Sequence, residues 1–203
     1  AWDPAELAER ARRAGMRYAV FTAKHHSGWA AWPSRATDLS IASSPFGRAG
    51  RDLVREYVDA FRAAGLRIGL YYSLSDWADP DYPAWRAEFA PYAFDGYPRS
   101  APESWDRYLA GMRQELDELL TDYGRIDLLW FDGGWERTAH EWRSVELEKH
   151  IRALQPDIVI NDRLPGVGDY VTPEQSAPPD LLSGPWEACA TLNTTKCYVP
   201  DDL

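Results

Sequence analysis

Cysteine is scarce in this chain, which has only Cys189 and Cys197 among its 203 residues. The two lie eight positions apart, which matches no metal-binding pattern, and the sequence does not decide whether they pair. Long apolar runs are also missing, because none approaches the roughly 18 residues that a membrane-spanning helix needs. No signal peptide is recognisable at the start.

Positive charge is in deficit as well, with 22 Lys and Arg against 32 Asp and Glu and a net charge of −10. Nucleic acids and anionic membrane surfaces bind basic proteins, so neither is expected as a partner. The oligomeric state cannot be read from the sequence. Because the chain opens inside a predicted helix and stops abruptly at Leu203, we expect a piece of a longer protein. The lack of a signal peptide therefore leaves the location of that protein open.

Tryptophan, by contrast, is common, with ten residues, and 45% of the chain is hydrophobic. That content is enough for a core, and no window has the composition of a disordered segment. Trp and Tyr rings pack on the apolar faces of sugars, but they are also ordinary core residues. The composition alone favours a carbohydrate ligand only slightly.

Helical and strand patterns alternate along the chain. Amphipathic helices are predicted at 4–14, 51–65, 103–123 and 141–154. Apolar strands are predicted at 17–23, 67–73, 126–132 and 157–163, with a fifth at 181–182 or 186–192. This alternation predicts βα units on a parallel sheet, either open and doubly wound or closed as a barrel.

Polar side chains at the C-terminal ends of the strands favour the barrel. They are Lys24, His25 and His26, then Tyr71, Tyr72 and Ser73, then Asp132, and finally Asn161, Asp162 and Arg163. A (β/α)8 barrel collects its active site at that end. No strand is followed by a GxGxxG or phosphate-binding loop, which weakens the open nucleotide-binding alternative. A full barrel needs about 250 residues. We therefore expect an α/β fold of the (β/α)8 TIM-like type, present as a partial barrel that lacks its first strand and last units.

His25 and His26 have three possible roles. They can cap a loop, ligate a metal or bind substrate hydroxyl groups. Adjacent residues of a strand point to opposite faces, so the two would not easily share one ion. No HExxH motif or nearby set of carboxylate ligands supports a metal.

Asp132 ends an apolar strand and is followed by Gly133 and Gly134. An Asp in this place often caps the next helix, but the clear helical pattern here starts some eight residues later. The glycines allow a sharp turn and are expected to leave space for a ligand. A carboxylate at the mouth of a barrel is a candidate nucleophile or base, so both roles stay open.

Other charged residues complete the candidate set. Arg163 could neutralise a carboxylate in the mouth, or form a surface pair with Asp162 or Asp169. Glu174 and Glu187 lie in apolar or aromatic company, which raises the pKa of a carboxyl group and suits a general acid. Glutamates on helical stretches are expected on solvated faces, namely Glu115, Glu118, Glu141 and Glu148.

These residues together describe a glycosidase. Retaining glycosidases place two carboxyl groups roughly 5 Å apart, one attacking the anomeric carbon and one protonating the leaving oxygen. Such a reaction needs no metal and no cofactor.

Six ordered motifs resemble the α-L-fucosidases of glycoside hydrolase family 29 over essentially the whole chain. They are AKHHSGWAAWPSRATDLSI, RDLVREYVDAFRAAGLRIGLYYSLSDW, LLWFDGGW, INDR, GDYVTPEQ and PWEAC. The resemblance implies a retaining exo-hydrolase that removes terminal α-L-fucose from fucosylated oligosaccharides or glycoconjugates. It makes residues 1–203 the central part of a (β/α)8 catalytic domain, without the C-terminal β-domain of the family. The parent protein would then be secreted, periplasmic or lysosomal.

The resemblance also implies roles for individual residues. Asp132 would be the nucleophile, with Arg163 near it. Glu174 would be the acid/base, with Glu187 as the runner-up and otherwise a substrate contact. The remaining candidates would contact the sugar: His25, His26 and Tyr71 through its hydroxyl groups, and Trp29 and Trp32 from the loop after the first strand.

Departures from the family pattern leave two alternative functions open. Ser27 stands where the family usually has Asp, and Lys196 and Cys197 replace an expected aromatic residue and glycine. A motif like HWG would precede Ala1. One rival is a catalytically inactive homologue that binds fucose, and the other is a metal-dependent hydrolase that uses His25 and His26.

Overall fold

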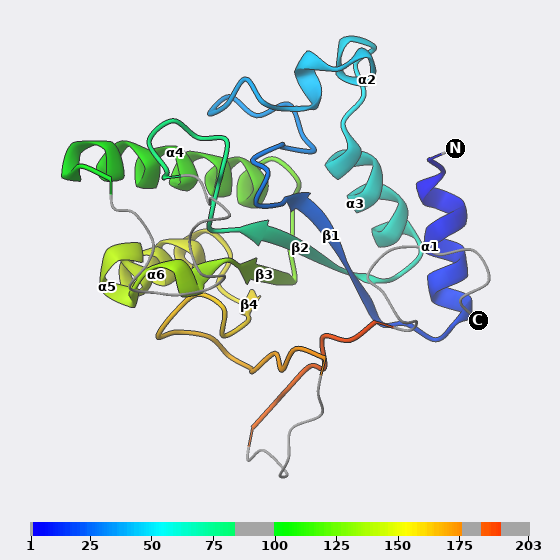
Figure 1. The fold of residues 1–203 in the computed structure, drawn as a ribbon. Coiled ribbons are helices and arrows are strands. Elements are labelled where there is room, and N and C mark those ends of the chain that lie inside the picture. Colours follow the sequence, from blue (N-terminus) through cyan, green and yellow to red (C-terminus); the bar gives the residue numbers. More distant parts are fainter. Residues whose placement is uncertain (1, 84–99, 176–183, 192–203) are drawn as a thin grey trace.

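The chain forms a parallel four-stranded sheet whose spatial order β1-β2-β3-β4 follows the order along the chain. The structure is a computed structural model that describes residues 2–83, 100–175 and 184–191. The strands are β1 (Tyr18–Lys24), β2 (Arg67–Ser73), β3 (Leu128–Asp132) and β4 (Val159–Ile160). The predicted βα units and parallel sheet are confirmed (Figure 1).

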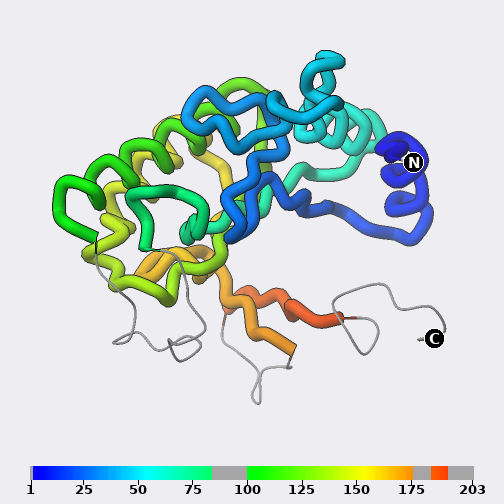
Figure 2. The backbone as a smooth tube through the Cα atoms, turned by 45° about the horizontal axis from the view of Figure 1, so that its top comes forward, coloured from blue at the N-terminus to red at the C-terminus, as the bar shows by residue number. Residues whose placement is uncertain are grey.

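Helices connect the strands and lie together on one side of the sheet (Figure 2). The longer ones are α1 (Pro4–Arg13), α3 (Leu53–Ala63), α4 (Pro102–Thr121) and α6 (Ser144–Leu154). Short elements join them: η1 (Ile41–Ser43), α2 (Pro45–Arg48), η3 (Gly134–Glu136) and α5 (Ala139–Trp142). Residues 184–191 run along the other side of the sheet (Figure 2).

Capping side chains define where several helices begin. Asp3 accepts a hydrogen bond from the Glu6 amide at the start of α1. Asp52 does the same for the Arg55 amide at the start of α3. Both satisfy an amide that has no partner within its helix.

Alternation along the strands separates two faces of the sheet. Ile68, Leu70 and Tyr72 of β2 are buried in the same core as Val58 of α3 and Leu116 of α4. The intervening side chains of β2 and β3 point to the other face, because neighbours along a strand alternate. Tyr71 is there in register with Trp130, and Ser73 with Asp132. Tyr71 and Asp132, two of the predicted polar residues at the strand ends, therefore lie on the face that the helices leave open.

Some predicted elements differ in the structure. The fourth strand is only Val159–Ile160, because Asn161 forms an isolated bridge to Tyr170 and the chain then turns at Asp162 instead of continuing as a strand to residue 163. The predicted helix 141–154 divides into α5 and α6 at Arg143, whose φ of 53° interrupts the helix. Of the two places proposed for a fifth strand, 181–182 lies outside the described residues. In the other, residues 186–191 form only isolated bridges, from Trp186 to Val171 and from Cys189 to Glu174.

Glu115 and Glu118 on α4 are buried, so the prediction of a solvated face was wrong for them. Lys24 lies 2.6 Å from Glu115, and the indole of Trp32 donates to Glu118 over 2.8 Å. Helical periodicity finds the inward face of α4 but does not reveal partners supplied by distant segments. Cys197 lies outside the described residues. Among those described, no helix has the length and hydropathy to cross a membrane.

Candidate functional site

Asp132 is the centre of the polar cluster on the open face. It ends β3, and its side chain is nearly buried. Arg163 donates to Oδ1 over 2.9 Å, and the Tyr71 hydroxyl donates to Oδ2 over 2.7 Å. Each carboxylate oxygen thus has one fixed donor, which holds the group as an oriented anion and leaves lone pairs for other partners. The Asp132 side chain therefore binds Arg163 and Tyr71 instead of capping a helix.

Arg163 joins Asp132 to a second carboxylate. Its Nη2 lies 2.5 Å from Oε2 of Glu174, and its Nε donates to Thr172 over 3.1 Å. The alternative of a surface pair with Asp169 is wrong, since Asp169 pairs with Arg152. Asp162 instead accepts from the Thr172 hydroxyl. Burial works to lower the pKa of Arg163, but Glu174 and Asp132 raise it above its ordinary value.

Aromatic rings line the site in a continuous row. His25 stacks on Tyr71 at 5.6 Å between centroids, and Tyr71 stacks on Trp130 at 5.5 Å. The guanidinium of Arg163 lies over the Trp130 ring at 4.5 Å. Burial and the charge of Asp132 raise the pKa of Tyr71, so its hydroxyl stays a donor.

Trp130 was not among the predicted site residues. It lies two positions before Asp132 on the same strand, and alternation puts both on one face. That spacing was the signal in the sequence that could have identified it.

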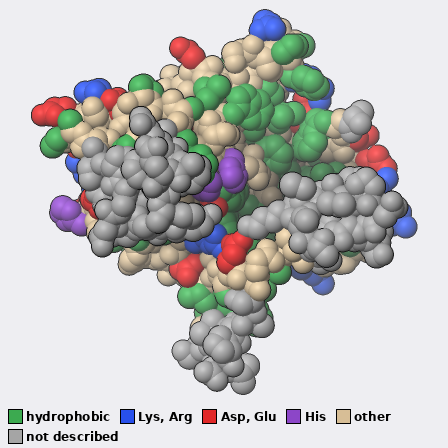
Figure 3. Space-filling model, in the orientation of Figure 1, with side chains coloured by type: hydrophobic (Ala, Val, Ile, Leu, Met, Phe, Trp, Pro, Cys, Tyr) green, Lys and Arg blue, Asp and Glu red, His purple; other side chains and the backbone are tan. Residues whose placement is uncertain are grey.

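His25 and His26 lie side by side rather than on opposite faces. Their ring centroids are 4.3 Å apart. The prediction was wrong because β1 ends at Lys24, so strand alternation no longer applies to them. Within the described residues no group of three His, Cys, Asp or Glu side chains is arranged to hold a metal ion. Figure 3 shows histidine side chains near the centre of the molecule, next to acidic and basic groups.

His26 faces Asp132, with Nε2 3.7 Å from Oδ2. Burial lowers its pKa to about 4, an effect that Asp132 opposes and His25 reinforces. The ring is therefore neutral at pH 7. A neutral imidazole is suited to hydrogen bonding with hydroxyl groups.

The glycines after Asp132 make room for protein atoms rather than for a ligand. Gly133 has φ +73°, and a Cβ there would lie 2.3 Å from the Ser75 hydroxyl. A Cβ at Gly134 would lie 2.0 Å from the Arg163 carbonyl oxygen. The predicted sharp turn is present, but the expected empty space is filled by neighbouring loops.

Glu187 also reaches the open face, from the segment that crosses it. Its carboxylate accepts from Tyr18 over 2.8 Å, from the Trp130 indole over 3.0 Å and from Tyr170 over 3.4 Å. It is thus an acceptor for three donors, whereas Glu174 contacts the arginine that also binds Asp132. Both candidate glutamates lie in the cluster, Glu174 in contact with Arg163 and Glu187 in contact with Trp130.

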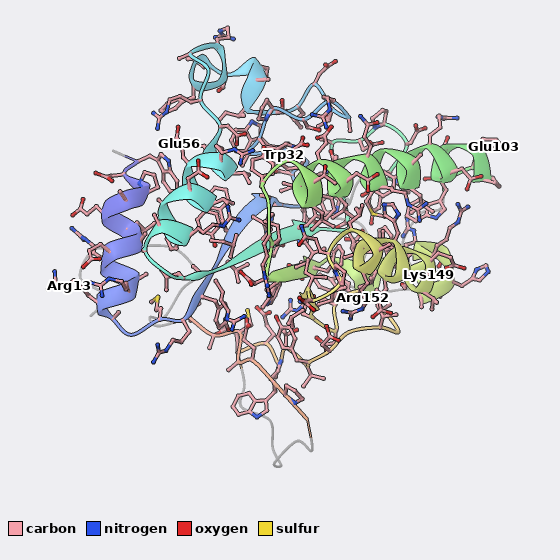
Figure 4. The ribbon with its side chains drawn as sticks, turned by 180° about the vertical axis from the view of Figure 1, so that it is seen from behind. Arg13, Trp32, Glu56, Glu103, Lys149 and Arg152 are labelled. Carbon is pink, nitrogen blue, oxygen red and sulfur yellow. The ribbon has the colours of Figure 1, made fainter. Side chains whose placement is uncertain are left out.

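The two tryptophans of the first loop differ in exposure. Trp29 is 37% exposed and stays available for contact. Trp32, labelled in Figure 4, is 1% exposed, and its indole donates to Glu118 of α4, so its prediction as a sugar contact does not fit its position. An aromatic residue in a loop sequence does not reveal whether the loop folds back into the core.

Comparison with known proteins gives one consistent result. A sequence profile for the family described as Alpha-L-fucosidase matches residues 1–202. The tissue alpha-L-fucosidase of Rattus norvegicus is 31% identical over 201 residues, which are 95% of this chain and 40% of that protein. This chain thus spans about two fifths of the length of such curated relatives.

Solved structures agree with the sequence comparison. Alpha-L-fucosidase isoenzyme 1 from Paenibacillus thiaminolyticus superposes with a TM-score of 0.85 at 43% identity, covering 99% of this chain and 51% of that one. A glycoside hydrolase family 29 alpha-L-fucosidase from Bacteroides thetaiotaomicron gives 0.80 at 28% identity, covering 95% and 46%. That structure is described as a trapped covalent intermediate in complex with 2-fluoro-fucosyl fluoride.

Proposed function

This chain belongs to the alpha-L-fucosidase family, glycoside hydrolase family 29, and from that membership we propose that it hydrolyses terminal α-L-fucose with retention of configuration. The substrate would be a fucosylated oligosaccharide or glycoconjugate. We propose that residues 1–203 are the central part of a (β/α)8 catalytic domain. The unreversed strand order, with the helices on one face, supports that architecture, since a doubly wound sheet reverses its order.

The carboxylate of Asp132, fixed by Arg163 and Tyr71 at a strand end, is the observation that carries the proposal. In the first step an oxygen of Asp132 attacks the anomeric carbon. The bond to the leaving oxygen breaks, and a proton from Glu174 neutralises that oxygen. In the second step water, deprotonated by Glu174, displaces Asp132 and releases fucose. Glu174 has then regained its proton from the water and Asp132 is again a free carboxylate, while the glycosidic bond has been replaced by a bond to the water oxygen.

Arg163 has two tasks in this scheme. It keeps Asp132 anionic, as a nucleophile must be, and it holds Glu174 near the reacting bond through its second nitrogen. Glu174 needs a proton to act as an acid, so its bond to Arg163 must loosen when substrate enters. Glu187 is the alternative acid/base, and its three donors favour the role of an acceptor that fixes Trp130.

The remaining side chains would recognise the sugar. His25, His26 and Tyr71 present polar atoms beside Asp132, and Trp29 presents aromatic surface. Burial removes Trp32 from this set. The scheme has no step for a metal or a cofactor.

Replacement of Asp132 tests the proposal directly. In the full-length protein, Asp132→Gly should release fucose from an aryl α-L-fucoside at least roughly a thousandfold more slowly. Azide should restore turnover and give a fucosyl azide of inverted configuration, because azide enters where Asp132 attacked. Asp157→Gly, a change at a side chain that is 81% exposed, is the control and should keep full activity.

The same product analysis assigns the acid/base. Azide acting on Glu174→Gln should give fucosyl azide of retained configuration, because the nucleophile is still present. The same result from Glu187→Gln would move the role to Glu187. A wild-type protein that binds fucose but releases none would instead identify an inactive fucose-binding homologue.

A further inference from the structure

Two serines hold the side chain of His26 from behind. Its Nδ1 lies 2.5 Å from the hydroxyl of Ser73 and 2.9 Å from that of Ser75. Ser73 is the last residue of β2, which pairs with β1, and Ser75 follows in the loop after β2. Both serine side chains are buried. Nε2, on the opposite edge of the ring, faces Asp132.

The donors at this site can be counted. The Ser73 hydroxyl donates its one hydrogen to the carbonyl oxygen of Ser75 over 2.6 Å, and a carbonyl cannot be the donor. The 2.5 Å contact between Ser73 and His26 therefore takes its hydrogen from Nδ1. The Ser75 hydroxyl accepts from Nδ1 as well and directs its own hydrogen elsewhere, with the Ser73 oxygen 3.3 Å away. A neutral imidazole carries one hydrogen, so Nε2 has none.

The backbone keeps this arrangement in place. The Trp77 amide donates to the His26 carbonyl, and the Leu74 amide donates to the Asp132 carbonyl, both over 2.8 Å. Gly133 leaves the space that the Ser75 hydroxyl occupies, since a Cβ there would lie 2.3 Å from it and 3.2 Å from Cε1 of His26. Three segments thus meet at the ring, and each is held by main-chain bonds.

We propose that Ser73 and Ser75 are positioning residues that fix His26 as the neutral Nδ1–H tautomer, so that Nε2 accepts a hydrogen bond from a sugar hydroxyl beside Asp132. The inference depends on the proposed function at one point only, namely that the hydroxyl group belongs to the sugar substrate. Nε2 and Oδ2 are both acceptors across 3.7 Å, a distance too long for a hydrogen bond between them. A hydroxyl group in contact with both gives its hydrogen to one of them.

The opposite tautomer would behave differently. An Nε2–H group would point at Oδ2 and share its proton with Asp132, which would weaken a nucleophile and remove the acceptor. In the described part of the chain, Asp132 and His25 are the titratable groups that act on His26. The other neighbours are the rings of Trp77 and Trp135. The hydrogen-bond contacts found for Nδ1 are those with the hydroxyl groups of Ser73 and Ser75, so we assign the choice of tautomer to the serines.

Nitrogen NMR measures the tautomer without any turnover. The full-length protein is labelled with 15N-histidine, and the His26 signals are identified by their loss in His26→Gln. At pH 7 we expect a protonated Nδ1 and an unprotonated Nε2. A protonated Nε2, or an imidazolium, would overturn the inference even if the protein cleaves fucosides. The expected tautomer in a protein that cleaves none would leave this inference intact and defeat the proposed function.

Serine variants test whether the hydroxyl groups cause the tautomer. Ser73→Ala/Ser75→Ala should shift His26 towards the Nε2–H form and lower kcat/KM for an aryl fucoside about tenfold, the effect of one lost hydrogen bond at a reacting centre. Ser75→Thr keeps a hydroxyl and should keep the tautomer. Ser144→Ala is the matched control, because Ser144 is also a buried serine and its hydroxyl has no hydrogen-bond partner among the described residues. An unchanged tautomer in a folded double variant would contradict the proposal, and if that variant does not fold, Ser73→Ala alone is measured against the same expectation.

Discussion

Two clusters of charged side chains lie at the same end of the sheet, one on each face, and they differ in how far they are closed. Lys24 pairs with Asp76 at 2.7 Å and with Glu115 at 2.6 Å on the helix side, where the three side chains are 3% to 6% exposed. Asp132, Arg163 and Glu174 on the open side are 12% to 37% exposed. We call these the closed cluster and the open cluster.

The closed cluster has its polar atoms matched by protein. Tyr72 donates to Glu115, and the amides of Ala78 and Asp79 donate to Asp76. Burial alone would lower the pKa of Lys24, but Glu115 and Asp76 raise it. The open cluster is also paired, but its side chains are more exposed to solvent. We conclude that a charged group at a strand end has a structural role when protein groups surround it. It is available for chemistry when it stays open to solvent.

Removal of Lys24 should have the largest effect on stability. Lys24→Met leaves two buried carboxylates without their cation, so the free energy of unfolding should fall by about 3–5 kcal/mol. Urea denaturation of the full-length protein measures this. Lys149→Met, a change at an exposed lysine of α6 (Figure 4), should leave the transition in place. A loss below about 1 kcal/mol for Lys24→Met would show that the closed cluster is not structural.

Low pH should have the second-largest effect on stability, through His26 beside the open cluster. The pKa of His26 is about 4 in the fold against 6.5 for an ordinary histidine. Between these pH values the unfolded chain binds a proton that the folded chain refuses. Stability present above pH 6.5 is therefore lost as the pH falls towards 4, by roughly 3 kcal/mol for this one group. The closed cluster responds at the other end of the scale, since the contribution of Lys24 is complete below pH 10.5 and is lost as pH rises through its raised pKa.

The measurement is the pH dependence of unfolding in wild type and in His26→Gln. We expect the wild-type curve to fall more steeply between pH 6.5 and 4, and the difference between the curves isolates His26. Parallel curves would mean that the ring is not held neutral by the fold.

Arg163→Met should affect turnover more than stability. It removes the donor that keeps Asp132 anionic, and we expect kcat to fall roughly a hundredfold, as when one electrostatic contact is lost at a reacting centre. Tyr71 still binds Asp132, so unfolding should change less than in Lys24→Met. Arg163→Lys restores the charge but not the two-nitrogen geometry of the guanidinium, so its rate should lie between those of wild type and Arg163→Met. Equal rates for wild type and Arg163→Met would remove the arginine from the mechanism.

An exposed pair should show the smallest effect. Arg107 contacts Asp81 at 2.5 Å, but its side chain is 61% exposed. Solvent already satisfies such charges, so Arg107→Gln should leave both the unfolding midpoint and the rate unchanged within error. A clear shift would show that short contact distance, rather than closure from solvent, sets the strength of these pairs.

The sequence predicts the sheet well and the two clusters less well. Alternating helices and strands predict the parallel order, and the motifs predict Asp132 and Arg163 at neighbouring strand ends. Lys24 is different, because the register between β1 and β2 shifts between Thr22 and Lys24 and brings Lys24 opposite Tyr72. Strict alternation from Thr22 would place Lys24 on the open face, and nothing in the local sequence announces the shift.

Contacts between residues far apart in the sequence were also not predicted. The contacts of Glu115 and Glu118 with Lys24 and Trp32 join residues more than 80 positions apart, which helical periodicity does not contain. The approach of Ser75 to Gly133 is of the same kind. Trp130, in contrast, was within reach of strand alternation.

The missing side chain at Gly133 has a consequence for how this site can change over generations. The Ser75 hydroxyl fills the volume in which a Cβ would lie, and the His26 ring lies against the same spot. A side chain at position 133 would be strained by the backbone φ of +73° and would also displace the Ser75 hydroxyl that contacts His26, so a smaller residue at position 75 would relieve only part of the cost. We therefore expect substitutions at positions 26, 75 and 133 to depend on one another during evolution, although the three residues come from separate stretches of the gene.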